Sequence, residues 1–432
     1  MTSNEFVGAR SVAEIRRDFP GIAAFAAAGA AYLDSAATSQ RPNVVIDTER
    51  DYLAGGIAPV HRGASNATGE STNLFEEARS AVADFVGVAE NEVVWTLNAT
   101  DAINMVSLGM ADASAGLGGS AAARFALQPG DEIVITEAEH HANLIPWQHL
   151  AKRTGAVLRA VRVDQQGLWS LDDLAVTLSD RTRVVAVADV SNVTGAITDV
   201  AAVVELAHAR GALVVLDACQ SVPHRPTNFT DLGVDFAAFS AHKMLGPNGL
   251  GVLAGRAELL DALPPARTGG STITKVTLDD AEFLPAPLRF EAGTQAVSQV
   301  IALGAAVGYL NELGMPAVAA HEQTLAMELA ERVAAMPGIR LVGPPPGAPR
   351  AGLVSVAVDG VHAHDVGQVL DSNGVIVRVG HHCAQPLHRA LGLTATVRAS
   401  AHVYTEASEL DGFMEGLAEV QRFFKVPAGA TA

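Results

Sequence analysis

The chain has 432 residues, of which 49% are hydrophobic and 18% are charged, and its formal net charge is −18. This length and composition predict a folded protein with one large and one smaller domain, and they exclude a disordered chain. The negative charge argues against nucleic-acid binding, because recognition of a phosphate backbone needs clustered Lys and Arg.

Three features of the sequence predict where the protein acts. It has only two cysteines, which form no disulfide framework, and its first residues do not resemble a secretory signal. The longest low-charge stretch, residues 21–33, is shorter than the roughly 20 apolar residues that cross a bilayer. We therefore expect a cytoplasmic protein with no membrane partner.

Short apolar strands alternate with helical segments through the first half of the chain. Residues 11–17 predict a short helix, and residues 32–35 predict a strand that enters a polar turn. Residues 76–86 have the pattern of an amphipathic helix, and residues 112–123 predict a surface insertion rich in Gly, Ala and Ser. Further strands are predicted at residues 92–96, 132–136, 157–161, 184–188 and 213–216. The alternation predicts βαβ units and an α/β fold with a mainly parallel sheet.

A smaller α+β domain is predicted to follow the large one. Residues 302–336 are helical in pattern, with a break at Met315-Pro316. The remaining predicted elements are a proline-rich loop at 344–347, strands at 353–358 and 375–379, and a closing helix at 406–424. We therefore divide the chain into an N-terminal segment (1–30) packed on the small domain, a large cofactor-binding domain (31–300) and a small C-terminal domain (301–432).

Two polar side chains end predicted strands of the large domain. The apolar run 214–216 ends in Asp217, and the segment 239–242 leads directly to Lys243. Ligands of parallel sheets bind beyond the carboxyl ends of the strands. A pyridoxal 5'-phosphate (PLP) enzyme needs both groups, because a lysine Schiff base holds the cofactor and a carboxylate keeps its ring nitrogen protonated. Cys383 lies in a later loop of small residues and histidines, so we predict a PLP enzyme with a nucleophilic thiol.

Seven motifs, in order from about residue 30 to the C-terminus, resemble those of the Suf-type (group II) cysteine desulfurases. They are residues 32–38 (YLDSAAT), 60–63 (VHRG), 139–143 (EHHAN), 191–195 (SNVTG), 239–243 (FSAHK), 289–294 (RFEAGT) and 378–384 (RVGHHCA). That family belongs to the class V branch of the fold-type I PLP aminotransferases. The resemblance implies a homodimer that converts L-cysteine to L-alanine. The sulfur would be held as a persulfide on Cys383 and passed to an acceptor in iron–sulfur cluster assembly.

The resemblance also implies how the residues would hold the cofactor ring. Lys243 would bind the cofactor covalently and move the α-proton, which requires a neutral amine. Asp217 would pair with the pyridine nitrogen, and Gln220 with the phenolate oxygen. His140 would stack on the ring and handle protons, since imidazole titrates near neutrality. Asn192 would lie over the cofactor oxygen and the substrate.

The cofactor phosphate needs hydroxyls, backbone donors and a helix N-terminus. Thr100 lies where a strand gives way to a helix, and it is the first candidate. Ser240 and His242 are the next candidates. By resemblance, Thr294 would reach the phosphate from the partner subunit. The chain departs from the family pattern at Asn98 and Ala99, where any hydroxyl contact at 99 is lost. It also departs at Ala241, Gln295 and Thr405, and none of these three changes removes a required functional group.

The substrate and the thiol have their own predicted residues. By resemblance, Arg398 is the residue that would bind the carboxylate of the substrate, and a guanidinium suits this role since it can bind a carboxylate with two hydrogen bonds. Arg378 would line the entrance to the same site. Cys383 would act as a thiolate, which nearby positive charge favours. Cys219 is interpreted as a packing residue.

Several alternatives remain open from the sequence. One alternative is selenocysteine lyase, which shares the fold and the thiol. Further enzyme alternatives are a specialised sulfur-transfer paralogue, another PLP aminotransferase and an epimerase. An alternative from a different class is a scaffold protein without a cofactor, which would be colourless. Zinc could bind to His362, His364 and the histidines before Cys383. However, no third and fourth ligand follow at a spacing typical of zinc sites, so we expect no metal site. His362 or His364 could instead contact a zinc-containing sulfur acceptor.

Overall fold

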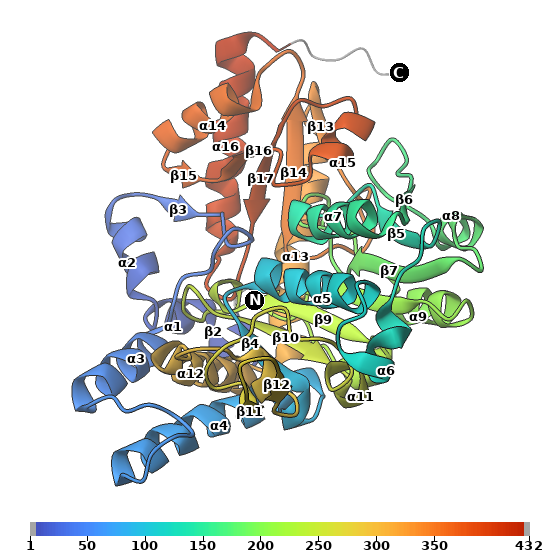
Figure 1. Cartoon of the computed structure of the whole chain (residues 1–432). Coiled ribbons are helices and arrows are strands. Elements are labelled where there is room, and N and C mark those ends of the chain that lie inside the picture. The colour runs from blue at the N-terminus through green and yellow to red at the C-terminus, as the bar shows by residue number, and fades with distance from the viewer. Residues whose placement is uncertain (1–5, 427–432) are drawn as a thin grey trace.

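The computed structural model describes residues 6–426, and a seven-stranded sheet forms its centre (Figure 1). In spatial order the strands are β4 (Val93–Thr96), β10 (Gly251–Gly255), β9 (Phe236–Ser240), β8 (Leu213–Asp217), β7 (Thr182–Ala188), β5 (Glu132–Thr136) and β6 (Val157–Val161). Strands β9, β8, β7, β5 and β6 run parallel, whereas β10 is antiparallel to both β9 and β4. The predicted mainly parallel sheet is confirmed.

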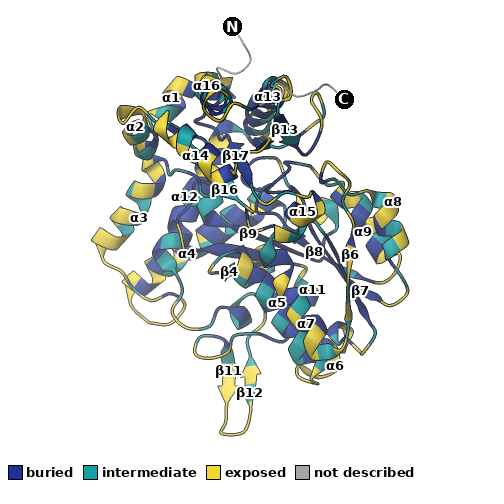
Figure 2. Cartoon of the chain, turned by 90° about the horizontal axis from the view of Figure 1, so that it is seen from above, coloured by how far each residue is buried: buried dark blue, intermediate teal, exposed yellow. Residues whose placement is uncertain are grey.

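Helices cover both faces of this sheet because successive strand residues point in opposite directions. In β8, Val214 and Leu216 belong to one hydrophobic core and Val215 to the other. The first core includes residues of α4 (Asn66–Val86), α8 (Leu171–Thr177), α9 (Val200–His208) and α12 (Val297–Leu313). The second includes residues of α5 (Ala99–Ser114), α6 (Gly119–Ala122), α7 (Ile145–Thr154) and α11 (Ala257–Leu260). The central strands are therefore buried on both sides (Figure 2).

A second, antiparallel sheet forms the smaller domain. Its strands, in spatial order, are β13 (Ile339–Val342), β14 (Leu353–Val358), β17 (Thr396–Ser400) and β16 (Arg378–Gly380). The hydrophobic core of this domain includes residues of α13 (Met315–Ala334), α14 (Ala363–Ser372) and α16 (Ala407–Phe424). The predicted break between α12 and α13 is confirmed: it falls at Gly314, and Pro316 stands in the first turn of α13.

The N-terminal segment contacts the C-terminal part of the chain. It contains β1 (Phe6–Val7), β2 (Arg10–Ser11), α1 (Val12–Arg16) and α2 (Pro20–Ala27), and it is followed by β3 (Ala31–Tyr32). Ser11 and Glu14 form a capping box that starts α1. Arg16 Nη1 donates to Tyr404 O at 2.7 Å and to Glu409 Oε2 at 2.9 Å. The domain boundaries at 31 and 300 stay predictions, and the second of them falls inside α12.

Some predicted elements differ from the observed ones. The single strand predicted at 375–379 is two strands: β15 (Val375–Ile376) pairs with β3, and β16 pairs with β17. The predicted insertion at 112–123 is largely helical, since it contains the end of α5 and all of α6. Helix α3 (Asn43–Gly55) and the hairpin of β11 (Ile273–Val276) and β12 (Ala281–Phe283), which projects from the body in Figure 2, were not predicted. The other short helices are α10 (Phe229–Leu232), α15 (Gln385–Ala390), η2 (Glu90–Glu92), η3 (Ala123–Phe125), η4 (His141–Asn143), η5 (Ala241–Lys243) and η6 (Leu288–Phe290).

Within the described part of the chain, no single helix is long and apolar enough to cross a membrane. Helices α12 and α13 meet that criterion only when taken together, and they are bent by 77° at their junction.

Candidate active site

A cavity of about 400 Å³ lies beyond the carboxyl ends of β7 and β8, and residues of the smaller domain complete its wall. Every predicted site residue except Thr294 lines it: Thr100, His140, Asn192, Asp217, Gln220, Ser240, His242, Lys243, Arg378, Cys383 and Arg398. The two halves of the chain therefore bring the predicted cofactor lysine and the predicted nucleophile to one cavity.

Asp217 and Lys243 stand at the ends of the neighbouring parallel strands β8 and β9. Asp217 is the last residue of β8, and the Cys219 N–H donates to its Oδ1 at 3.0 Å, which orients the carboxylate. Lys243 ends the turn η5 that follows β9. Lys243 forms no ion pair with any residue in the range 6–426, so it is not a structural lysine held by a carboxylate. Its amine is free to bind a ligand in the cavity.

The N-terminus of α5 opens into the same cavity. Asn98 caps the helix by accepting the Asp101 N–H, and the Ala99 N–H donates to Ser240 Oγ at 2.9 Å. Strand β10 approaches this turn so closely that a Cβ on Gly251 would lie 2.4 Å from Asn98 Cα. Glycine at 251 therefore allows the helix end and the strand to meet. With Thr100 and His242 nearby, this end of α5 is a suitable site for a phosphate.

His140 presents a hydrogen-bond donor to the cavity. Its Nδ1 accepts the Ala142 N–H at 3.0 Å, so the neutral ring carries its hydrogen on Nε2. Burial lowers the pKa of His140 to about 4; Asp217 opposes this shift and the Lys243 charge adds to it. The ring is therefore neutral at pH 7, as a residue that stacks on an aromatic cofactor would be.

Arg398 is buried at the centre of β17 and retains one nitrogen without a partner. Its Nη1 donates to Asn192 O at 2.8 Å, and its Nη2 lies 3.3 Å from Asp34 Oδ1. Burial lowers the pKa of Arg398 to about 10, although Asp34 opposes the shift, so the guanidinium stays charged near neutral pH. Its Nε makes no hydrogen bond within the described residues. Such a buried, unpartnered donor is what a substrate carboxylate would satisfy.

The loop that carries Cys383 is anchored to the large domain. His382 and Cys383 have φ of 49° and 56°, a left-handed conformation that costs non-glycine residues free energy. Asn192 Nδ2 donates to His382 O at 2.6 Å, and the His141 N–H donates to Cys383 O at 2.6 Å. The Gln385 N–H also donates to His141 Nε2 at 3.1 Å. Sequence reasoning missed this anchoring by His141, because it joins segments more than 240 residues apart.

Three other predicted residues lie as follows. Gln220 Nε2 donates to Ala36 O at 2.8 Å, which leaves its second amide hydrogen available to a ligand. Thr294 lies in a different cavity, of about 690 Å³, which it shares with Leu53, Ile57 and Arg62. Cys219 belongs to the second hydrophobic core, and burial raises the pKa of its thiol, which agrees with its interpretation as a packing residue.

The residues in the cavity fit PLP. Lys243 would hold the cofactor covalently, Asp217 would face its ring nitrogen, and the end of α5 would hold its phosphate. The unpartnered Arg398 Nε remains for the carboxylate of an amino-acid substrate. The exposed Cys383 is the one free thiol that reaches this cavity from the smaller domain.

Comparison with known proteins gives the same family along almost the whole chain. The family described as aminotransferase class-V matches residues 31–413. The "Probable cysteine desulfurase 2" of Mycobacterium leprae (strain TN) is 51% identical over 413 residues, which cover 95% of this chain and 96% of the relative. The "Cysteine desulfurase" of Haloferax volcanii is 40% identical over 395 residues, which cover 91% of this chain and 90% of the relative.

Solved structures agree in fold over the full length. The apo cysteine desulfurase of Thermococcus onnurineus NA1 has a TM-score of 0.89 at 35% identity, covering 97% of this chain and 100% of that chain. The cysteine desulfurase CsdA of Escherichia coli has a TM-score of 0.86 at 34% identity, and the match covers 96% of this chain and 100% of that chain. A mutant of C-DES with glycine covalently linked to its PLP cofactor shares the fold at 24% identity and a TM-score of 0.78.

Proposed function

This chain belongs to the class V aminotransferase family and is a PLP-dependent cysteine desulfurase, and we propose that it uses Cys383 to take sulfur from L-cysteine. The observation that carries the proposal is that one cavity gathers Asp217, Lys243, Arg398 and Cys383. The first two suit cofactor binding, the third suits an amino-acid carboxylate, and the last supplies a thiol.

Each side chain has a defined task in the reaction. PLP, when bound, draws electrons away from the substrate's α-carbon. Arg398 Nε and its guanidinium charge bind the carboxylate of L-cysteine, which fixes the position of the α-carbon. Lys243 Nζ takes the α-proton and returns a proton during formation of alanine. His140 holds a hydrogen on Nε2, which it can donate to a ligand in the cavity.

The transfer of sulfur from L-cysteine to Cys383 needs no oxidant or reductant. Cys383 Sγ, as a thiolate, attacks the sulfur of L-cysteine; an S–S bond forms, the substrate's C–S bond breaks, and its electron pair stays on carbon. Protonation of that carbon gives L-alanine, and Cys383 retains a persulfide. A thiol acceptor or reductant then removes the terminal sulfur. The anchoring of the Cys383 loop by His141 and Asn192 supports this arrangement, since it holds the thiol at the cavity.

We also propose partners for this chain. A homodimer would place Thr294 near a partner's site, and the second cavity, with the exposed Leu53 and Ile57 in its wall, suits a subunit contact. We propose that the acceptor serves iron–sulfur cluster assembly in the cytoplasm. If the acceptor contains zinc, His362 and His364 are suitable contacts, because both are exposed and their rings stack 5.2 Å apart at the start of α14.

The experiment that tests the proposal measures alanine and sulfide from L-cysteine with purified protein and a reductant. We expect both products in equal amounts, and a persulfide on Cys383 by mass spectrometry when the reductant is left out. Cys383→Ala should bind PLP normally and form neither product. Full turnover by that variant would refute the role of the thiol, and a parallel assay with L-selenocysteine would reveal a preference for selenium.

A further inference from the structure

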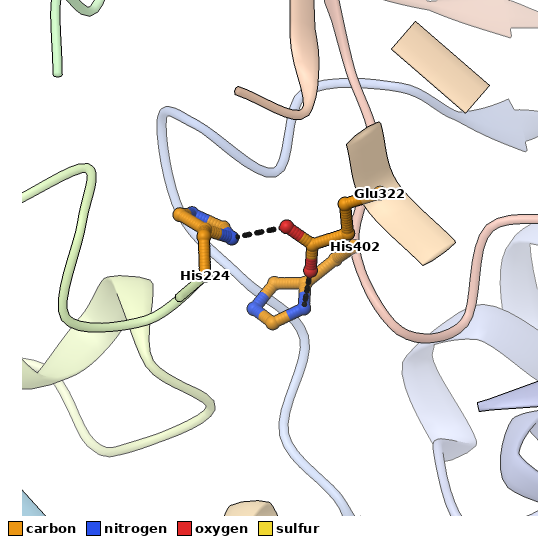
Figure 3. Close-up of side chains that lie close together, drawn as sticks. All are labelled: His224, Glu322 and His402. Carbon is orange, nitrogen blue, oxygen red and sulfur yellow. Dashed lines mark hydrogen bonds and ion pairs between the residues drawn. The ribbon is translucent and has the colours of Figure 1, made fainter. Parts of the chain in front are cut away.

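Three side chains from distant parts of the chain meet outside the residues that line the active-site cavity. His224 lies in the loop that follows β8, Glu322 is in α13, and His402 follows β17 (Figure 3). All three are buried, and Glu322 and His402 are at most 1% exposed. His224 Nδ1 lies 2.7 Å from Glu322 Oε2, and His402 Nδ1 lies 3.0 Å from Glu322 Oε1.

The hydrogen bonds of this cluster leave two buried atoms without a partner. Glu322 Oε1 makes no hydrogen bond among residues 6–426, although it lies 3.0 Å from His402 Nδ1. His402 Nε2 also has no partner within those residues, because the Val403 N–H donates to the other ring nitrogen, Nδ1. Unsatisfied buried polar atoms of this kind are what a bound ion would satisfy.

We propose that His224, Glu322 and His402 form a binding site for one divalent transition metal, with zinc as the ion that their chemistry favours. Two imidazole nitrogens and one carboxylate oxygen are a known ligand set for zinc, with bonds of about 2.0–2.2 Å. The three donor atoms lie within 4.8 Å of one another. Tetrahedral ligands at those bond lengths stand about 3.4 Å apart, so shifts of about 1 Å complete the site.

The three ligands come from three distant segments of the chain: His224 follows β8, Glu322 is in α13 and His402 follows β17. The ion would also tie the loop after Asp217 to the strand that carries Arg398, so the site is structural and inessential to the chemistry at Cys383.

The test measures zinc in the purified holoenzyme. Protein made in zinc-supplemented cells and dialysed against EDTA should retain about one zinc per chain, as a buried three-ligand site would. His402→Phe, which keeps the ring volume, should reduce the zinc content at least about tenfold. As controls, His362→Ala/His364→Ala and Cys383→Ala should keep it, because these residues could otherwise bind zinc at the surface. Wild-type protein without zinc, or zinc lost in the controls but kept in His402→Phe, would overturn the proposal.

X-ray absorption at the zinc edge of the wild-type protein gives an answer even if His402→Phe does not fold. We expect nitrogen and oxygen ligands with imidazole scattering, and a sulfur ligand would overturn the proposal. Alanine production from L-cysteine is measured on the same sample. An active enzyme without zinc would therefore refute only the metal site, and an inactive enzyme with zinc would refute only the proposed function.

Discussion

Replacing His141 by Ala tests whether the Cys383 loop must be anchored to the large domain. The substitution removes the ring nitrogen that accepts the Gln385 N–H, and it leaves the main-chain bond to Cys383 O intact. A net hydrogen bond contributes about 0.5–1.5 kcal/mol. Gln385 N–H is exposed, so water replaces the lost partner and the cost falls to about 0.5–1 kcal/mol, or a factor of about 2–5.

The pH dependence gives this prediction a second, independent readout. His141 accepts the bond only when its ring is neutral, and burial together with the nearby His381 lowers its pKa from 6.5. The anchoring bond is therefore fully present above pH 6.5 and is lost as the pH falls through the lowered value. The ratio of wild-type to His141→Ala rates should accordingly approach one in acid.

The assay is the single-turnover rate of persulfide formation on Cys383, with cofactor absorbance recorded in parallel. His141→Ala should slow persulfide formation about 2–5-fold at pH 8 while the absorbance stays unchanged. His149→Ala, an exposed histidine on α7, is the matched control and should have the wild-type rate. Equal rates for all three proteins at pH 8, or loss of cofactor from His141→Ala, would refute the anchoring role.

Three further changes test the rest of the site. Lys243→Ala should lower alanine production by at least about 10³-fold, and substantial remaining activity would exclude it as the cofactor lysine. In Arg398→Lys the new side chain cannot bind a carboxylate with two parallel hydrogen bonds, which removes about 1.5–3 kcal/mol of binding free energy. The value of kcat/KM for L-cysteine should therefore fall about 10–100-fold, and the cofactor absorbance should stay unchanged. Gly251→Ala places a Cβ 2.4 Å from Asn98 Cα, so titration with PLP should give a higher Kd; Gly308→Ala, with nothing within 4 Å, should leave the Kd unchanged.

The large domain could be predicted well because its strands follow a local rule. Parallel strands buried on both faces are short apolar runs, and the acid and the lysine at the ends of two such runs necessarily reach the same edge of the sheet. That is why Asp217 and Lys243 line one cavity, as expected. The positions of Arg398 and Cys383 depended on the family resemblance, since no local pattern places the smaller domain against the larger one.

The features that were missed depend on contacts between distant segments. Residues 375–379 are one apolar run in the sequence. In the structure, the first part of this run pairs with strand β3 near the N-terminus, and the last part pairs with strand β17 of the small domain. The hairpin of β11 and β12 is largely exposed, so it lacks the apolar pattern by which strands are recognised. His224, Glu322 and His402 are separated by 98 and 80 residues, and their meeting depends wholly on tertiary structure.

The left-handed loop around Cys383 limits the conditions under which the protein works. Three hydrogen bonds from the large domain hold it, worth about 1 kcal/mol each. The left-handed conformations of His382 and Cys383 weaken this anchoring, so release costs at most about 3 kcal/mol, against the roughly 5–15 kcal/mol typical of global unfolding. Gentle heating should therefore silence sulfur transfer while the circular dichroism spectrum is still native. A melting curve would overstate the useful lifetime of a stored sample, and activity is the quantity by which its shelf life should be judged.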